Sequence, residues 1–185
     1  GESLSYSWDI GMGTNFTALY AYYLASPVNW LIVLFPQKYI IEIMNAIIII
    51  KASLASVAFT YYISRHFNNK SCTIALFGMF YGMSGFIAAY SWNIMWLDCI
   101  VMLPVVMLGL ERLVNENKCL LYCISLGFCI YTNYYIAIMI CISVVLYFVV
   151  LMFVYNRNRS FKIYLKKFFN FCLYSLLAGG LAACL

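Results

Sequence analysis

The chain has 185 residues, of which 66% are hydrophobic and only 9% are charged, with a formal net charge of +5 and a mean hydropathy of +0.92. Soluble globular chains carry about 25% charged residues, so this composition excludes a soluble domain. Long apolar runs with few charges recur along the chain and are typical of transmembrane helices. The composition therefore predicts an all-α, polytopic membrane protein.

The first 38 residues differ from the rest of the chain. Apolar residues recur at helical spacing over residues 14–25, and a second short helix is expected over residues 28–35. Their tyrosines and tryptophans favour amphipathic helices that lie in the membrane interface. The chain begins at Gly1 in polar sequence and stops inside an apolar run, so we interpret it as a piece of a longer protein, truncated at both ends.

Apolar runs after residue 38 predict a bundle of about six helices over residues 39–185. The runs lie at residues 39–63, 71–90, 96–113, 119–131, 135–155 and 168–185. About 20 residues are needed to cross the hydrocarbon core, so the fourth run is short for a span. Joined to the fifth run it would be too long for one helix, and the polar residues 132–135 offer a place to turn.

Basic residues give the expected orientation. Nine of the eleven Lys and Arg residues lie at residues 65–70, 112–118 and 157–167, and the positive-inside rule makes these three loops cytoplasmic. An even number of crossings must then separate the last two loops, so residues 132–135 form an outer turn. Residues 1–38 and 90–98 share that outer, extracytoplasmic side of the membrane.

Acidic residues are few, and both aspartates fall on the outer side. Asp98 could be a catalytic carboxylate or could stabilise a helix N-terminus through the helix dipole, and Asp9 has the same alternatives. Glu111 and Glu116 lie among cytoplasmic bases, where a solvated loop is expected. The outer side also holds further candidates for substrate binding, of which the tryptophans could equally be interfacial belt residues: Trp92, Asn93, Trp96, Asn133 and Tyr134.

Lys51 follows four isoleucines and lies about 18 Å below the outer end of its span. A charge at that depth is costly and normally faces a bundle interior or an aqueous cavity, where it pairs with an anion. The partner could be structural, such as Glu42, or it could be the phosphate of a ligand. The sequence leaves both alternatives open.

Several classes of site have no support in the sequence. The eight cysteines contain no CxxC pair and there is one histidine, so no metal, haem or iron–sulfur site is assigned and the cysteines are interpreted as small apolar residues. No nucleotide-binding motif occurs, and the GxxxG spacing of Gly78 and Gly82 favours close helix packing. The net positive charge reflects loops that face anionic membrane lipids, and it does not indicate nucleic-acid binding.

Four sequence strings resemble the bacterial YfhO family of polytopic membrane proteins, and the resemblance covers residues 1 to about 155. They are YSWDIGMGTNFTALYAYYLASP, FYGMSGFIAAYSWNIMWLDC, LPVVMLGLERLV and TNYYIAIMI. The resemblance implies a GT-C-type glycosyltransferase fold. It also implies transfer of a sugar from a polyprenyl-phosphate carrier to an extracytoplasmic envelope polymer such as lipoteichoic acid.

This resemblance gives the candidate residues expected roles. Asp98 and Asp9 are the candidate catalytic carboxylates, which could act as a general base or assist a divalent metal. Lys51 could pair with the carrier phosphate, and the outer aromatic and amide side chains could bind a sugar. The family's main carboxylate is expected upstream of Gly1. The alternatives are a lipid or solute transporter, including a flippase, in which Lys51 marks the substrate path, and a structural membrane scaffold.

Overall fold

The computed structural model describes residues 13–15, 17, 20–156 and 161–183, and all regular elements among these residues are helices. Two short 3₁₀ helices and one π-helical turn precede the bundle. The elements in chain order are η1 (Tyr20–Leu24), η2 (Asn29–Leu34), η3 (Gln37–Tyr39), α2 (Ile40–His66), α3 (Cys72–Gly82), α4 (Gly85–Tyr90), α5 (Ile94–Glu116), α6 (Leu120–Thr132), α7 (Tyr134–Asn156) and α8 (Phe161–Ala182).

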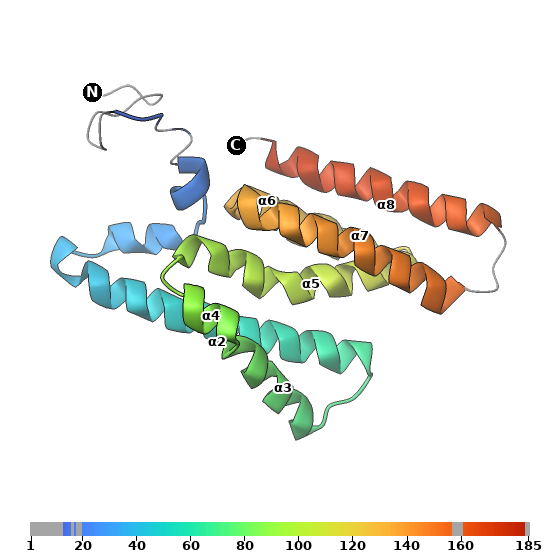
Figure 1. The fold of residues 1–185 in the computed structure, drawn as a ribbon, viewed down its shortest axis with the longest axis horizontal. Coiled ribbons are helices and arrows are strands. Elements are labelled where there is room, and N and C mark those ends of the chain that lie inside the picture. The colour runs from blue at the N-terminus through green and yellow to red at the C-terminus, as the bar shows by residue number, and fades with distance from the viewer. Residues whose placement is uncertain (1–12, 16, 18–19, 157–160, 184–185) are drawn as a thin grey trace.

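The long helices run back and forth with their axes side by side (Figure 1). Helix α5 is central, because it packs against α2 on one side and against α6 and α7 on the other, while α8 packs on α6. In the apolar stretch of α5, 61% of the residues are buried inside the protein, compared with 17% in that of α2 and 39% in that of α7. Helices α5, α6, α7 and α8 supply most of the buried apolar core.

Within the described residues, four segments are long and apolar enough to cross a membrane: Gln37–His66, Cys72–Tyr90, Ile94–Glu116 and Tyr134–Val154. Helix α6 is apolar but shorter, and it meets α7 at Asn133, whose backbone is extended (φ −161°, ψ 105°). The turn predicted at residues 132–135 is therefore confirmed. The architecture is an all-α polytopic bundle.

Two features of the helices differ from the predicted runs. The second run is divided at Met83 and Ser84, where Ser84 is extended (φ −62°, ψ 152°) and α4 begins. Helix α8 begins at Phe161 rather than at Phe168. Hydropathy cannot find that start because the first turns of α8 carry lysines, which are good helix formers but not apolar.

Asparagines end two of the long helices. Asn68 follows α2 with φ 49°, and Asn117 follows α5 with φ 57°, both in the left-handed region. Among residues with a Cβ, asparagine is one of the few that enters this region readily. We call this end of the bundle the Glu111 end, and the opposite end, where α5 begins and Asn133 forms its turn, the Asp98 end.

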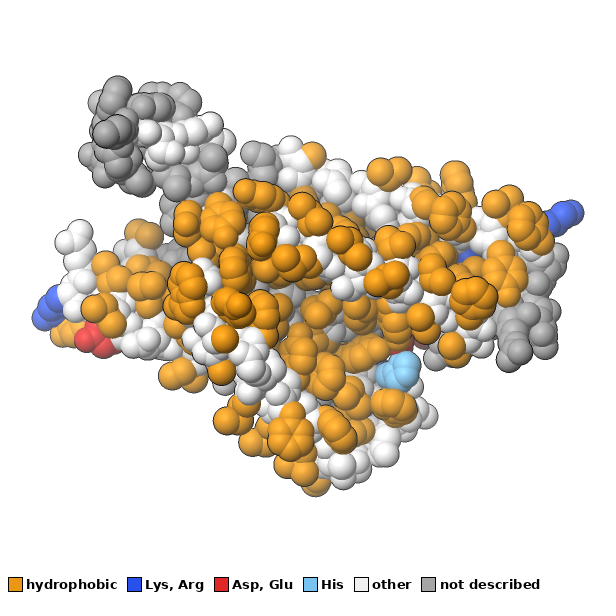
Figure 2. Space-filling view, in the orientation of Figure 1, with side chains coloured by type: hydrophobic (Ala, Val, Ile, Leu, Met, Phe, Trp, Pro, Cys, Tyr) orange, Lys and Arg blue, Asp and Glu red, His pale blue; other side chains and the backbone are white. Residues whose placement is uncertain are grey.

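The surface is that of a protein in lipid. Figure 2 shows hydrophobic side chains along the length of the helices and charged side chains at the two ends. Ile49, Phe80 and Leu146 are among the many large apolar residues that are more than half exposed. Soluble monomers rarely expose apolar surface on this scale, whereas lipid tails cover it without cost.

Small residues let α3 approach α2 closely. A Cβ atom added at Gly82 would lie 2.8 Å from the Ala52 carbonyl oxygen, and one added at Gly78 would lie 2.7 Å from the Ser56 carbonyl oxygen. Both glycines are buried. The GxxxG spacing therefore serves helix packing here, as the sequence indicates.

Candidate functional site

A buried ion pair joins α2 to α5 at the Asp98 end. Lys51 Nζ lies 2.8 Å from Asp98 Oδ2, and the two side chains are 1% and 5% exposed. The ammonium group also donates to Asn29 Oδ1 at 2.8 Å and to the Ile94 carbonyl oxygen at 3.0 Å. Its three N–H donors thus meet three acceptors, which explains how a lysine is tolerated deep in an apolar span.

The partner of Lys51 is therefore Asp98, which lies 47 residues further along the chain. Glu42, the structural partner considered from the sequence, is exposed in the first turn of α2. Asp98 does not stabilise the start of α5, because it lies in the second turn of that helix, beyond the first turn in which the helix dipole acts. Its carboxylate is engaged by the lysine instead.

A cavity of about 430 Å³ lies beside this ion pair. Its walls come from the segment before α2, from α2, and from the start of α5. They combine two asparagines and two tryptophans with a mainly apolar lining: Asn29, Asn93, Trp30, Trp92, Tyr23, Ile32, Val33, Met44, Ile94 and Met95. Lys51 holds two of these walls together, because its acceptors Asn29 and Ile94 both line the cavity.

Asn93 is the polar group of this cavity that stands out. The residue is 4% exposed, and its Nδ2 atom has no hydrogen-bond partner among the described residues. Buried amide groups are nearly always hydrogen-bonded in folded proteins, so an unpaired one next to a cavity indicates a position where a ligand atom could bind. Trp92 precedes it, is 70% exposed and donates through Nε1 to the Ala89 carbonyl oxygen.

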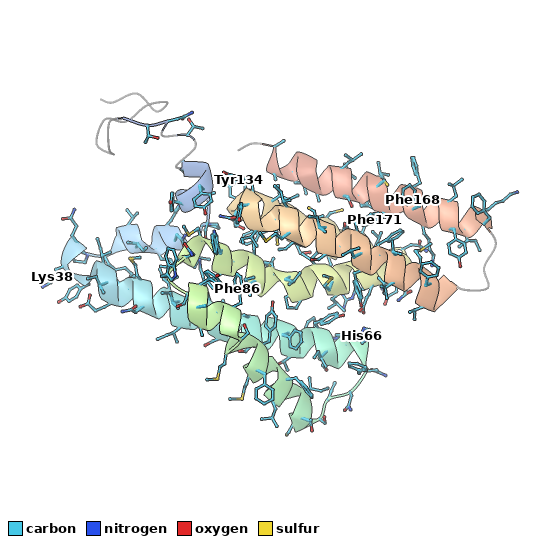
Figure 3. The ribbon with its side chains drawn as sticks, in the orientation of Figure 1. Lys38, His66, Phe86, Tyr134, Phe168 and Phe171 are labelled. Atoms are coloured by element: carbon cyan, nitrogen blue, oxygen red, sulfur yellow. The ribbon has the colours of Figure 1, made fainter. Side chains whose placement is uncertain are left out.

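Three other predicted residues form a separate group on α5 and the α6–α7 turn. Trp96 does not line the cavity. It packs on Tyr135 with ring centroids 5.9 Å apart and donates to the Tyr22 hydroxyl at 3.3 Å. Tyr134 is about half exposed at the Asp98 end (Figure 3), and its ring contacts Tyr22 edge to face.

Asn133 is fully buried at the α6–α7 turn. Its Oδ1 accepts a hydrogen bond from the Ile136 backbone N–H at 3.0 Å, and its Nδ2 donates to the Tyr22 carbonyl oxygen at 3.4 Å. The residue thus caps the first turn of α7 and ties the segment before α2 to the bundle. This role is structural.

We predict that Asn133→Ala lowers the free energy of unfolding by about 1–2 kcal/mol, because a helix cap and a buried tie are both lost. Thermal unfolding of the purified protein in detergent measures the change. Asn133→Ser keeps an acceptor for the cap and is expected to recover part of the loss. Equal stability of the alanine variant and the wild type would contradict the assignment.

Sequence reasoning missed Asn29 and Trp30 of the cavity lining and placed one glutamate wrongly. Asn29 and Trp30 gave no spacing signal, although they repeat the adjacent amide and indole of Trp92 and Asn93 in reverse order. Glu111 is not in a solvated loop: it is 7% exposed inside α5. Ser26 is fully buried and its hydroxyl has no partner among the described residues.

Asp9 lies outside the described residues. Among the described residues, no group of three or more His, Cys, Asp and Glu side chains is placed to hold a metal ion.

Comparison with known protein families gives a match over the whole chain. The sequence model of the family described as bacterial membrane protein YfhO matches residues 1–185. No curated protein and no solved structure matches the chain. The match extends past residue 155, where the resemblance given by the four strings ends, to include the basic stretch and α8. It agrees with the polytopic bundle. The chain belongs to the YfhO family of bacterial membrane proteins.

Proposed function

We propose that this chain is part of a membrane glycosyltransferase of the GT-C type in the bacterial plasma membrane. In this proposal a sugar passes from a polyprenyl-phosphate carrier to an extracytoplasmic envelope polymer such as lipoteichoic acid. Membership of the YfhO family supports a membrane enzyme of this kind in general terms. The observation that carries the proposal is the cavity at the Asp98 end, with its unpaired Asn93 amide.

The chemistry of the cavity suits an uncharged, hydroxyl-rich ligand. The Asn93 amide can donate a hydrogen bond to a sugar hydroxyl, and the adjoining Trp92 and Trp30 offer flat apolar faces of the kind that pack on sugar rings. A few polar groups in a mainly apolar lining are typical of small-molecule sites. Lys51 is not among the lining residues, and its donors are all engaged.

We therefore propose a positioning role for the Lys51–Asp98 pair, which would keep Asn29 and the start of α5 in register around the sugar. The carrier phosphate would then be bound by groups other than Lys51. Asp9 remains our proposed general base: it would take the proton of the acceptor hydroxyl while the new bond to the anomeric carbon forms and polyprenyl phosphate leaves.

The orientation in this proposal rests on charge. Leaving aside the lysines and the arginine of η3 and α2, the described basic residues form three groups. They lie in the α2–α3 loop, at the end of α5 with the loop that follows it, and at the start of α8. All three groups are at the Glu111 end. Under the positive-inside rule that end faces the cytoplasm and the Asp98 end faces outward. Donor and acceptor would meet on that outward face.

We predict that Asn93→Ala lowers sugar transfer about tenfold or more, as expected for one lost ligand hydrogen bond. Its Nδ2 atom has no partner among the described residues, so the free energy of unfolding should change by less than about 0.5 kcal/mol. Asn45→Ala, on the exposed side of α2 near the same end, is the matched control and should leave both quantities unchanged. Loss of stability in parallel with activity would contradict a ligand-binding role.

Deletion of the gene tests the function itself. Envelope polymers isolated from the deletion strain should lack a sugar substituent that the wild-type strain carries, and expression of the full-length protein should restore it. If the glycosylation of every envelope polymer is unchanged by the deletion, the proposed function is wrong.

One structural feature favours a second candidate, a lipid or solute flippase. The span Cys72–Tyr90 is divided between α3 and α4, and discontinuous helices form substrate sites in many transporters. The break, however, contributes no residue to the cavity beside Lys51. A flippase would move the lipid-linked sugar across a bilayer without changing its chemistry, which separates the two candidates.

A further inference from the structure

A second hollow, of about 290 Å³, lies at the Glu111 end between the ends of α2 and α5. Unlike the cavity at the Asp98 end, it is lined mainly by charged and amide side chains, which include Arg65, Arg112, Asn68 and Asn115. His66 marks this end of α2 in Figure 3. Nothing in the proposed sugar transfer uses these residues.

Arg65 and Arg112 both line the hollow, which they share with the carboxylates of Glu111 and Glu116, and Glu116 lies within electrostatic range of Arg112. Both guanidinium groups lie beside the Tyr61 hydroxyl, and Arg65 also lies over the Tyr61 ring, 5.3 Å from its centroid. Neither arginine forms a salt bridge within the described part of the chain. Two like charges held around one neutral hydroxyl repel each other, and an anion bound between them would remove that repulsion.

The carboxylates that share the hollow are already engaged. Glu111 Oε1 accepts hydrogen bonds from Tyr62 at 3.1 Å, from His66 Nδ1 at 2.7 Å and from the Tyr147 hydroxyl. Glu116 forms a salt bridge of 2.8 Å with Lys118. The Glu111 network also fixes α2, α5 and α7 to one another, so the arginines are presented from a rigid frame.

We propose that this hollow binds a phosphate group, either that of an anionic lipid headgroup or free phosphate. Guanidinium groups match phosphate oxygens with paired N–H donors, and the amides of Asn68 and Asn115 can supply further donors. The hollow lies where apolar spans end, which is the depth of lipid headgroups, and phosphate-bearing lipids attract basic residues there. This site is distinct from the proposed sugar site and does not depend on it.

The test uses the purified full-length protein in a neutral detergent. Native mass spectrometry gives the affinity for phosphatidylglycerol and for zwitterionic phosphatidylcholine, with and without added inorganic phosphate. Arg65→Gln and Arg112→Gln are each expected to weaken phosphatidylglycerol binding about tenfold, the loss that one charge-assisted hydrogen bond gives. Lys70→Gln removes the same charge at the same end from a residue outside the hollow, and it should change the affinity less than twofold.

The outcomes separate the two sources of phosphate. Saturable phosphatidylglycerol binding that inorganic phosphate does not displace assigns the hollow to a lipid headgroup, and displacement by inorganic phosphate assigns it to free phosphate. Equal losses for Lys70→Gln and Arg112→Gln, or no preference for phosphatidylglycerol and no phosphate binding, would overturn the proposal, because the arginines would then only complement the helix C-termini. Using two arginine variants keeps the test valid if one of them fails to fold.

Discussion

Lys51→Met is expected to lower the free energy of unfolding by about 3–5 kcal/mol, because it leaves the Asp98 carboxylate buried without its cation. The Asp98 side chain is only 5% exposed, so water cannot replace the ammonium group. The Asn29 and Ile94 oxygens lose a donor in the same change. Chemical unfolding of the purified protein in detergent measures the effect.

Two further variants separate the ion pair from general effects of charge. Lys38→Met removes an exposed lysine near the same end and should change stability by less than about 0.5 kcal/mol. The double variant Lys51→Met with Asp98→Leu should recover most of the loss, because two apolar side chains can replace a buried pair at little cost. If Lys51→Met is no worse than Lys38→Met, the buried pair does not hold α2 to α5.

Gly82→Ala is expected to lower the free energy of unfolding by about 1–3 kcal/mol through overpacking between α2 and α3. The added Cβ atom would lie 1.8 Å from Ser56 Oγ and 2.8 Å from the Ala52 carbonyl oxygen. A serine hydroxyl can rotate away, but the carbonyl oxygen belongs to the backbone of α2. The two helices must therefore separate, and thermal unfolding in detergent should show a lower transition temperature.

Gly85 provides the matched control for this substitution. A Cβ atom at Gly85 would meet nothing within 4 Å, and alanine is the better helix former by up to about 1 kcal/mol. Gly85→Ala should therefore leave stability unchanged or raise it. Adding Ser56→Ala to the Gly82 variant should recover only part of the loss, because the contact with the Ala52 carbonyl oxygen remains. Equal stability of the Gly82 and Gly85 variants would contradict close packing of α3 on α2.

Much of the fold could be predicted from hydropathy and charge, because both are patterns of residues that lie close together in the sequence. The requirement that Lys118 and Arg157 lie on the same side of the membrane predicts a turn between α6 and α7. In the structure the two helices meet at Asn133. The break at Ser84 was not predicted, because apolar residues continue on both sides of it. The start of α8 was missed because its lysines belong to the helix but not to the apolar run.

The site was harder to predict than the fold, because its contacts join residues far apart in the sequence. Lys51 was correctly singled out as a buried charge in need of a partner, but nothing in one sequence links it to Asp98, 47 residues away. Asn29 accepts a hydrogen bond from Lys51, and it lies in a segment whose sequence predicts an interfacial helix. The burial of Glu111 was not predicted, because the bases next to it in the sequence are typical of a solvated loop. Its burial depends on contacts with Tyr62 and Tyr147.

The central claim is that sugar transfer from a lipid carrier takes place at the Asp98 end, and a reconstituted assay tests it most directly. Full-length protein in proteoliposomes would receive a radiolabelled polyprenyl-phosphate sugar and a lipid-anchored envelope polymer. We predict that label passes to the polymer, that a nucleotide sugar cannot replace the carrier, and that Asn93→Ala lowers transfer while Asn45→Ala does not. Movement of the labelled carrier across the bilayer without any transfer of label would contradict the claim.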